Sequence, residues 1–363
     1  MLDYIKALSE RLSSYRQMLN LYLVANVRGM TQDFVDYAGT SVVSEFLTLN
    51  QYELIIESLR MLGFEVGSYF DENEFIRDCI ESYSFRSTGK QALVINTAQK
   101  GTAIGRKSLI PAFCDLNGLW HTNSNAYVVS LTRNKFHCDS ILKAHSFPSP
   151  QNFIFFPSGE WLLDKKPLFG EKVIAKLNGE TSSIGLTKDN VFIFDESKED
   201  FIKTLSQSYG QPVIVQAFIE GYEVEVSVVN DGIACEVVLP VGISINGSKK
   251  LDEAILDYEA RKNLAFGFYN YRDYCPSTSF KLEECAKQAI KVLGIEGFGR
   301  VDFRIDSSGN FSITDVAANP HLTKGMSFNY AFQENGMNYN DMLEALILIT
   351  VARYKNKSQK IST

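Results

Sequence analysis

The spacing of apolar residues predicts a helix at the start of the chain and alternating strands and helices after it. Apolar side chains recur at helical spacing at Leu2, Ile5, Leu8, Leu12 and Tyr15. Apolar runs indicate three strands, at 21–27, 64–70 and 92–98. The segment 50–63 between the first two has the helical period and ends at Gly63. This β-α-β order predicts a parallel sheet with helices on its faces, an α/β domain.

The pattern changes near residue 123. One long helix is expected from there to the segment of Pro148 and Pro150, where proline forbids continuation. Short strands with a two-residue period follow between 172 and 230, around a helix at 198–209, and indicate an antiparallel sheet and an α+β second half. A further helix, two strands and a C-terminal helix complete the chain. We expect three domains, at 1–122, 123–205 and 206–363.

Composition limits the partners. The formal net charge of -7 and the lack of a long basic run disfavour nucleic acid. No apolar run approaches the roughly 20 residues of a membrane span, and the charged N-terminal helix is not a signal peptide, so no membrane partner is expected. The 6 cysteines include no CxxC pair, which favours reduced thiols and a cytoplasmic location.

A lysine, two glycines and several hydroxyl residues come together in KLNGETSSIG, 176–185. Glycines let backbone amides approach an anion, and a lysine supplies a point charge, so the segment is typical of a phosphate loop. A Gly/Ser-rich hairpin turn is about as compatible with this composition. Farther on, Gly221 breaks a strand and Glu223 opens the next one. A carboxylate at such a break either accepts hydrogen bonds from ribose hydroxyls or is simply solvated.

Two acidic residues lie on neighbouring strands near the C-terminus. In GRVDFRID the alternation puts Asp302 on one face and apolar residues on the other, and in the strand of TDVAANPH we expect Ile313 and Asp315 to share a face. Two carboxylates plus substrate phosphates suffice for Mg²⁺. A salt bridge between Arg300 and Asp315 across the strands is the alternative interpretation.

Seven motifs in this order resemble the ATP-grasp superfamily, most closely its D-alanine:D-alanine ligase branch. The resemblance runs from about residue 90 to the C-terminus. It rests on PAFCDLNG, the pair Asn134–Lys135 with PSP after it, KLNGETSSIG, QAFIEGYEVEV, ILDYEARK with YCPS, GFGRVDFRID and DVAANPHLT. The resemblance implies an N-terminal α/β domain followed by two α+β lobes that clasp ATP.

The resemblance also implies roles for single residues, which we state as expectations. Lys135 and Lys176 are expected to hold the ATP phosphates, and Gly179 and Ser183 belong to the loop that closes over them. The adenine contacts are expected from Gln216, Phe218 and Ile219, and the ribose contact from the Glu223 carboxylate. Asp302 and Asp315 match the magnesium ligands. Arg300 matches the arginine at the developing oxyanion, with Arg261 and Ser182 as further catalytic candidates.

Several positions depart from the family pattern. Ala317 stands where an asparagine usually binds a second magnesium, and Asn319 lies about 13 Å along an extended strand from Asp315, too far to share its ion. We therefore expect one firm Mg²⁺ and a weak second one. His321 replaces a glycine. The segment 41–46 is at best a remnant of a glycine-rich substrate motif, with Glu45 a candidate for binding a substrate ammonium.

The leading hypothesis is an ATP-dependent carboxylate-amine ligase that works through an acylphosphate, on amino acids or amines outside standard cell-wall dipeptide synthesis. A module that binds ATP but has lost ligation is the first alternative, and a divergent D-Ala:D-Ala ligase is the second. A homodimer is compatible with the family. The sequence leaves both substrates and their stereochemistry open.

Overall fold

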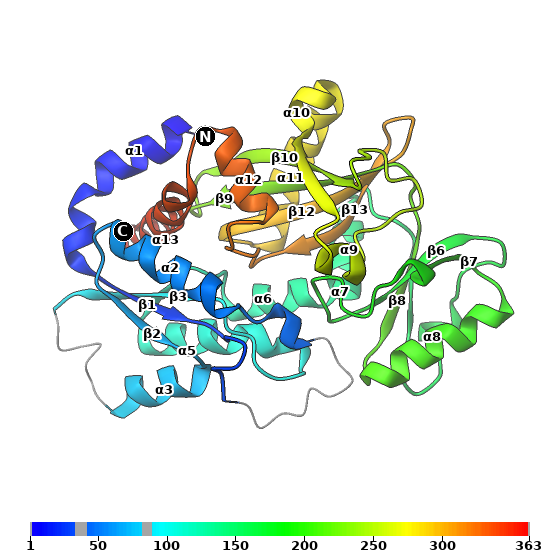
Figure 1. The fold of residues 1–363 in the computed structure, drawn as a ribbon, viewed down its shortest axis with the longest axis horizontal. Coiled ribbons are helices and arrows are strands. Elements are labelled where there is room, and N and C mark those ends of the chain that lie inside the picture. Colours follow the sequence, from blue (N-terminus) through cyan, green and yellow to red (C-terminus); the bar gives the residue numbers. More distant parts are fainter. Residues whose placement is uncertain (1, 33–41, 82–88, 362–363) are drawn as a thin grey trace.

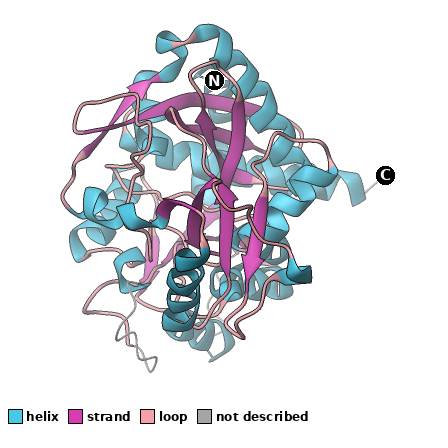
Figure 2. Ribbon diagram, turned by 90° about the vertical axis from the view of Figure 1, so that its right-hand side faces the viewer, coloured by secondary structure: helices cyan, strands magenta, loops and turns pink. Residues whose placement is uncertain are grey.

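The computed structural model describes residues 2–32, 42–81 and 89–361. Three sheets organise these residues: a parallel sheet near the N-terminus, an antiparallel sheet in the middle of the chain, and a larger antiparallel sheet in the C-terminal half. Figure 1 shows the middle sheet, in green, as a lobe at one end of the molecule, and Figure 2 views the molecule from that end. The α/β fold with two α+β lobes is therefore confirmed.

The N-terminal sheet has the order β2-β1-β3-β4, and all its described pairs are parallel, as expected from the β-α-β pattern. Its strands are β1 (Leu19–Val24), β2 (Val66–Tyr69), β3 (Gln91–Asn96) and β4 (Trp120–His121). Its helices are α1 (Leu2–Leu12), α2 (Leu49–Met61), α3 (Glu72–Glu81) and α5 (Leu109–Asn117), with short 3-10 helices at Ser13–Met18, Val42–Glu45 and Ile104–Ser108. Thr48 caps α2 with a reciprocal capping box.

The segment after residue 123 forms two helices, which corrects the single long helix that we expected. They are α6 (Ala126–Arg133) and α7 (Lys135–Ala144). Asn134 ends one and caps the other, because its backbone is extended (φ -91°, ψ 95°) and its side chain accepts from the His137 N–H. Asn178 also donates to the Asn134 side chain, at 3.0 Å. The break makes Lys135 the first residue of a helix that starts at the site described below.

The middle lobe is an antiparallel sheet of order β5-β8-β6-β7 with one long helix on it. Its elements are β5 (Asn152–Phe155), β6 (Lys172–Leu177), β7 (Val191–Ile193), α8 (Glu196–Tyr209) and β8 (Val213–Ala217), with 3-10 helices at Leu162–Asp164 and Lys188–Asn190. Strand β8 lies beyond the boundary at residue 205 that we expected, yet it pairs with β5 and β6. The three-domain division itself stays a prediction.

The C-terminal sheet has the order β11-β10-β9-β12-β13. Its strands are β9 (Tyr222–Asn230), β10 (Cys235–Ile245), β11 (Phe266–Asn270), β12 (Gly297–Ile305) and β13 (Phe311–Ala317). The helices of this part are α9 (Tyr258–Lys262), α10 (Tyr271–Tyr274), α11 (Pro276–Leu293), α12 (Ser327–Glu334) and α13 (Tyr339–Ile361). Helix α13 packs back on α1 and α2, so one apolar core joins both ends of the described chain. No helix within the described ranges is long and apolar enough to span a membrane.

Candidate active site

A cavity of about 160 Å³ lies between the middle lobe and the C-terminal sheet. Among the expected site residues, all but Gly179 line it: Lys135, Lys176, Ser182, Ser183, Gln216, Phe218, Ile219, Glu223, Arg261, Arg300, Asp302 and Asp315. The Gly179 N–H instead donates to the Gln211 side chain, at 3.1 Å. Residues from sequence positions as far apart as 135 and 315 therefore meet on one wall.

The two expected phosphate lysines face the acidic end of the cavity. The Lys135 Nζ atom lies 2.6 Å from Oδ2 of Asp315. Burial lowers the pKa of the Lys176 ammonium to about 8, and the Asp315 carboxylate acts in the opposite direction. Both lysines come from element ends that point at the cavity, since Lys135 opens α7 and Lys176 lies near the end of β6.

Arg300 binds carboxylates on its own strand and on the neighbouring strand β9. Its Nε and Nη2 atoms each lie 2.7 Å from an oxygen of Asp302, and Nη1 lies 3.2 Å from Glu225. The alternative prediction of a salt bridge between Arg300 and Asp315 is therefore wrong, because Arg300 pairs with Asp302 and Glu225 instead. Burial raises the pKa of the Asp302 carboxyl to about 7, with the nearby Glu225 and Asp315 charges acting in the same direction against Arg300.

A β-bulge sets the direction of Asp315. Asp302 pairs with Asp315, whereas the next pair is Phe303 with Ile313, so one extra residue lies in β13. Ile313 consequently packs in the core while Asp315 lines the cavity. This corrects our expectation that both residues share a face: strict alternation fails where the bulge inserts Thr314.

The carboxylates fit a magnesium ion. Asp302 and Asp315 are register partners on adjacent strands and both line the cavity. Burial is the main cause of the raised pKa of Asp302, and the Glu225 and Asp315 charges add to it, so a divalent cation beside Asp302 would favour its ionised form. Within the described residues, no group of three or more His, Cys, Asp or Glu side chains is placed to hold a metal by itself. The site thus fits the mode in which one or two carboxylates and substrate phosphates share Mg²⁺.

Another part of the cavity wall includes the apolar side chains of Phe218 and Ile219. Phe218 lies beneath the Arg304 guanidinium, with 4.8 Å between the guanidinium carbon and the ring centroid. Arg304 also donates to Glu223, at 3.1 Å, and to the Ile219 carbonyl, at 2.9 Å. Gly221 allows the turn before Glu223, because its φ of 130° is left-handed and an added Cβ would lie 2.1 Å from the Ile305 carbonyl oxygen. An aromatic face beside a carboxylate suits a base and its ribose.

The loop after β6 covers the cavity with two residues in a left-handed backbone, Ser182 (φ 56°) and Ser183 (φ 60°). Ser183 accepts from Arg261 Nε, at 2.9 Å. The Ser182 hydroxyl lies 3.1 Å from Glu45 and 3.0 Å from His321 Nε2. Sequence positions that depart from the family pattern, His321 and Arg261, therefore contact this loop directly.

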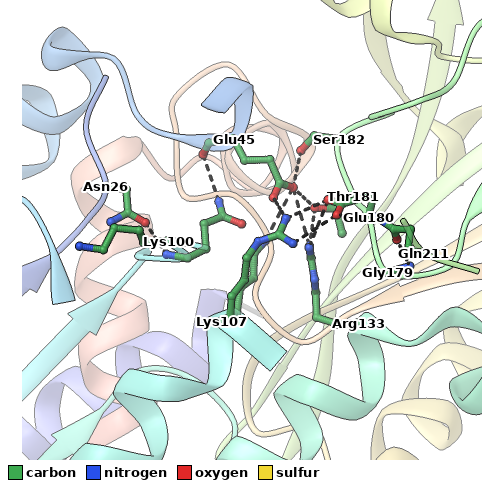
Figure 3. Close-up of polar contacts among 12 residues, drawn as sticks. Asn26, Glu45, Lys100, Lys107, Arg133, Gly179, Glu180, Thr181, Ser182 and Gln211 are labelled. Carbon is green, nitrogen blue, oxygen red and sulfur yellow. Dashed lines mark hydrogen bonds and ion pairs between the residues drawn. The ribbon is translucent and has the colours of Figure 1, made fainter. Parts of the chain in front are cut away.

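Buried charges tie the same loop to the N-terminal domain (Figure 3). Arg106 lies 2.8 Å from Glu180 and 3.2 Å from Glu45, and Arg133 lies 3.6 Å from Glu180 and 3.8 Å from Glu45. Burial would raise the pKa of Glu45, but Lys107, Arg133 and Arg106 together lower it to about 2. We call these five residues, Glu45, Arg106, Lys107, Arg133 and Glu180, the charge cluster. Glu45 is fully engaged there, which argues against the ammonium-binding role considered from the sequence.

Sequence reasoning missed Glu225, Arg304 and the charge cluster. The alternation in EGYEVEV puts Glu225 on the face of Glu223, so that signal was present. Arg304 likewise shares the face of Arg300 and Asp302 in β12. Nothing in the local pattern indicates the charge cluster, because Arg106 meets Glu45 and Glu180 across separations of 61 and 74 residues.

The comparisons with known proteins agree with this geometry. Residues 154–348, more than half of the chain, match the family model described as D-ala D-ala ligase C-terminus. The chain is 28% identical over 260 residues to the D-alanine--D-alanine ligase of Carboxydothermus hydrogenoformans, covering 68% of this chain and 77% of that protein. It is 25% identical over 246 residues to the ligase of Francisella tularensis subsp. novicida, covering 67% and 76%.

Solved structures show the same fold. The D-alanine--D-alanine ligase from Bacillus anthracis, complexed with ATP, superposes with a TM-score of 0.68 at 12% identity, covering 94% of this chain and 99% of that one. The VanG D-Ala:D-Ser ligase from Enterococcus faecalis gives 0.66 at 16% identity, covering 91% and 99%. The chain therefore belongs to the D-alanine:D-alanine ligase family of the ATP-grasp superfamily and is an ATP-dependent carboxylate-amine ligase.

Proposed function

We propose that the chain activates a small carboxylic acid with ATP and Mg²⁺ and joins it to an amine, with the residues of the large cavity in the roles that the family resemblance implies. The observation that carries this proposal is the convergence of Lys135, Lys176, Arg300, Asp302 and Asp315 on one cavity wall. Three cations beside two carboxylates match the needs of phosphoryl transfer, in which charge spreads over the transferring oxygens.

The nucleotide lies with its base near Phe218 and its ribose at Glu223. Arg304 donates to one oxygen of the Glu223 carboxylate, at 3.1 Å, and so holds this cavity-lining side chain in place. The phosphates then extend toward Lys135 and Lys176, and Ser182 and Ser183 cover them. Asp302 and Asp315 would hold Mg²⁺, which supplies charge stabilisation on the phosphate oxygens when it is bound.

The reaction has two steps. An oxygen of the acid attacks the γ-phosphorus of ATP, the bond from that phosphorus to the bridging oxygen breaks, and ADP leaves. The amine nitrogen then attacks the acyl carbon, phosphate leaves with the electron pair of the C–O bond, and the nitrogen loses a proton. Arg300, held by Asp302 and Glu225, stabilises the oxyanion of the second step.

One assay tests this proposal: ADP release with ATP and Mg²⁺ across a panel of D- and L-amino acids, other small acids and small amines. We expect strong stimulation by a particular acid and amine, with an amide as the product. Tight ATP binding without stimulation across the panel would instead support the module that has lost ligation, an alternative that Ala317 and His321 favour.

A further inference from the structure

The imidazole of His321 lines the large cavity together with Arg300 and Arg261. The side chain is partly exposed, and its Nε2 atom lies 3.0 Å from the Ser182 hydroxyl oxygen. Its other nitrogen, Nδ1, has no hydrogen-bond partner among the described residues, yet it is not closed off from solvent as Nδ1 of His121 is. Where the family pattern has a glycine, this chain therefore presents a ring with one nitrogen held and the other accessible.

The positions of the hydrogens on this ring follow from Glu45. The pKa of Glu45 is about 2, so its carboxylate is ionised at pH 7 and only accepts hydrogen bonds. The Ser182 oxygen lies 3.1 Å from a Glu45 oxygen, and two oxygens this close need a hydrogen between them. Ser182 has one hydroxyl hydrogen, and the charged carboxylate is the stronger acceptor. The contact between Ser182 and His321 then takes its hydrogen from the ring, so Nε2 carries the proton and Nδ1 the free lone pair.

The surrounding charges keep this ring neutral. Burial lowers the pKa of His321 to about 4. Three cations act in the same direction and one carboxylate acts against them: Lys107, Arg261 and Arg300, and Glu45. Nδ1 is therefore free to accept a proton at pH 7. ATP and an acylphosphate would bring negative charge to the same cations, which raises the pKa of His321 toward the range of an efficient base.

From this arrangement, and resting on the proposed function, we propose that His321 is the base of the second step and that its Nδ1 atom takes the proton of the attacking amine. The lone pair of the amine nitrogen forms the bond to the acyl carbon, and the proton moves from this nitrogen to Nδ1. Phosphate leaves with the electron pair of the C–O bond, and the imidazolium later gives its proton to water. In this step Glu45 and Ser182 are positioning residues, because they act on the amine only through the tautomer of His321.

The first test reads the tautomer and needs no substrate. The chain has 4 histidines, so ¹⁵N spectra of the full chain with labelled imidazoles are simple, and the His321 signals are those that His321→Gln removes. We expect a neutral ring at pH 7 with its proton on Nε2, which becomes charged near pH 4. Ser182→Ala removes the acceptor and should mix the two tautomers. A proton on Nδ1, or a charged ring at pH 7, overturns the proposal.

The second test separates the two steps of the reaction. The full chain receives ATP, Mg²⁺ and each acid of the panel at pH 7, with alanine of either hand or methylamine as the amine, and the amide is measured. Parallel reactions contain hydroxylamine in place of the amine. Hydroxylamine traps an acylphosphate without the help of a base, so the hydroxamate reports the first step alone.

His321→Gln keeps an N–H donor for Ser182 but has no atom that takes up a proton at neutral pH. We expect this variant to form the amide about 100-fold more slowly or worse, the usual contribution of a general base, with hydroxamate formation unchanged. His145→Gln is the matched control, because His145 is exposed at the end of α7 and lies outside the cavity. It should change neither rate.

His321→Gly restores the glycine of the family pattern and serves if His321→Gln fails to fold. Added imidazole fits the space that the side chain leaves and should restore amide formation. Pyrazole has the same shape and almost no basicity, so it should not. Rescue by imidazole alone supports the base, whereas equal rescue by both compounds, or by neither, overturns it.

The outcomes separate the two proposals. Amide formation that is equal in His321→Gln and the unmodified chain, or a loss of amide and hydroxamate together in that variant, overturns the base and leaves the ligase intact. Hydroxamate without amide in the unmodified chain also overturns the base. Absence of both products with every acid in the unmodified chain overturns the proposed function, and the role of His321 in the second step falls with it.

Discussion

The ammonium of Lys135, at the start of α7, lies 2.6 Å from the Asp315 carboxylate on β13. The pair joins a residue expected to bind phosphate with one expected to bind magnesium. Both side chains line the cavity, and the Lys135 side chain is only 8% exposed. A change at either residue therefore alters the charge that the other presents to ATP, because a close pair is weakly screened in a buried site.

Lys135→Met should raise the KM for ATP by at least about tenfold, since a phosphate charge partner is lost. Lys143→Met is the matched control on the same helix. Lys143 pairs with Asp139 at 2.8 Å near the surface and lies outside the cavity, so its loss should change the KM less than about twofold. ADP release at varied ATP measures both. Equal effects would assign the result to the stability of α7 and not to the phosphate site.

Ala317→Asn should strengthen a second magnesium site, which we expect to be weak in the unmodified protein. Ala317 lines the cavity and pairs with Arg300 across β12 and β13, so an amide oxygen there reaches the acidic wall. We expect the Mg²⁺ concentration for half-maximal ADP release to fall by about tenfold, equivalent to ~1.4 kcal/mol of binding free energy. Ala317→Val controls for side-chain size. An unchanged Mg²⁺ dependence in Ala317→Asn would show that this position does not contact a metal.

The sequence predicted the fold well where local patterns decide it. The parallel β1-β3 sheet and the strand β12 follow from apolar runs and alternation, because each element buries the face that the pattern defines. The prediction failed at Asn134, because the apolar residues on both sides of it keep the helical period while Asn134 itself ends α6 and caps α7. It failed again at Thr314, because a bulge shifts the register by one residue without a signature of its own.

The candidate site was predictable only through motif order. Asp302 and Asp315 are local features, but their convergence with Lys135 is tertiary. The charge cluster was not predictable, because neither the segment of Glu45 nor that of Glu180 indicates in its own pattern that both pair with Arg106. Long-range pairing of this kind carries no period in the sequence.

Glu45→Gln should destabilise the protein most at neutral pH. The pKa of Glu45 is about 2 in the folded chain, below its ordinary value, so its ionised form stabilises the fold above pH 4.5 and this contribution is lost as the pH falls from about 4.5 to 2. Removing one member of a buried charge group costs about 3–5 kcal/mol. The deficit in unfolding free energy against the unmodified protein should therefore be large at pH 7 and shrink toward pH 3.

Glu65→Gln controls for the loss of any carboxylate in the Glu45 experiment. Glu65 pairs with Lys90 at 3.3 Å, and its side chain is 83% exposed. Its substitution should change the unfolding free energy by less than about 0.5 kcal/mol at either pH. Denaturant titrations at the two pH values measure both variants. A Glu45→Gln deficit that does not depend on pH would contradict the ionised state assigned to Glu45.

Gly221→Ala should impair both stability and ATP binding, because the backbone turn at Gly221 determines the position of Glu223. A Cβ at 221 would lie 2.1 Å from the Ile305 carbonyl oxygen, in a backbone with φ of 130°, whereas at Gly210 (φ 60°) a Cβ meets no heavy atom within 4 Å. We expect Gly210→Ala to cost about 1 kcal/mol of unfolding free energy and Gly221→Ala at least about 2 kcal/mol more. Only Gly221→Ala should raise the KM for ATP, since the shift displaces the carboxylate that faces the ribose; equal KM values in the two variants would place the ribose elsewhere.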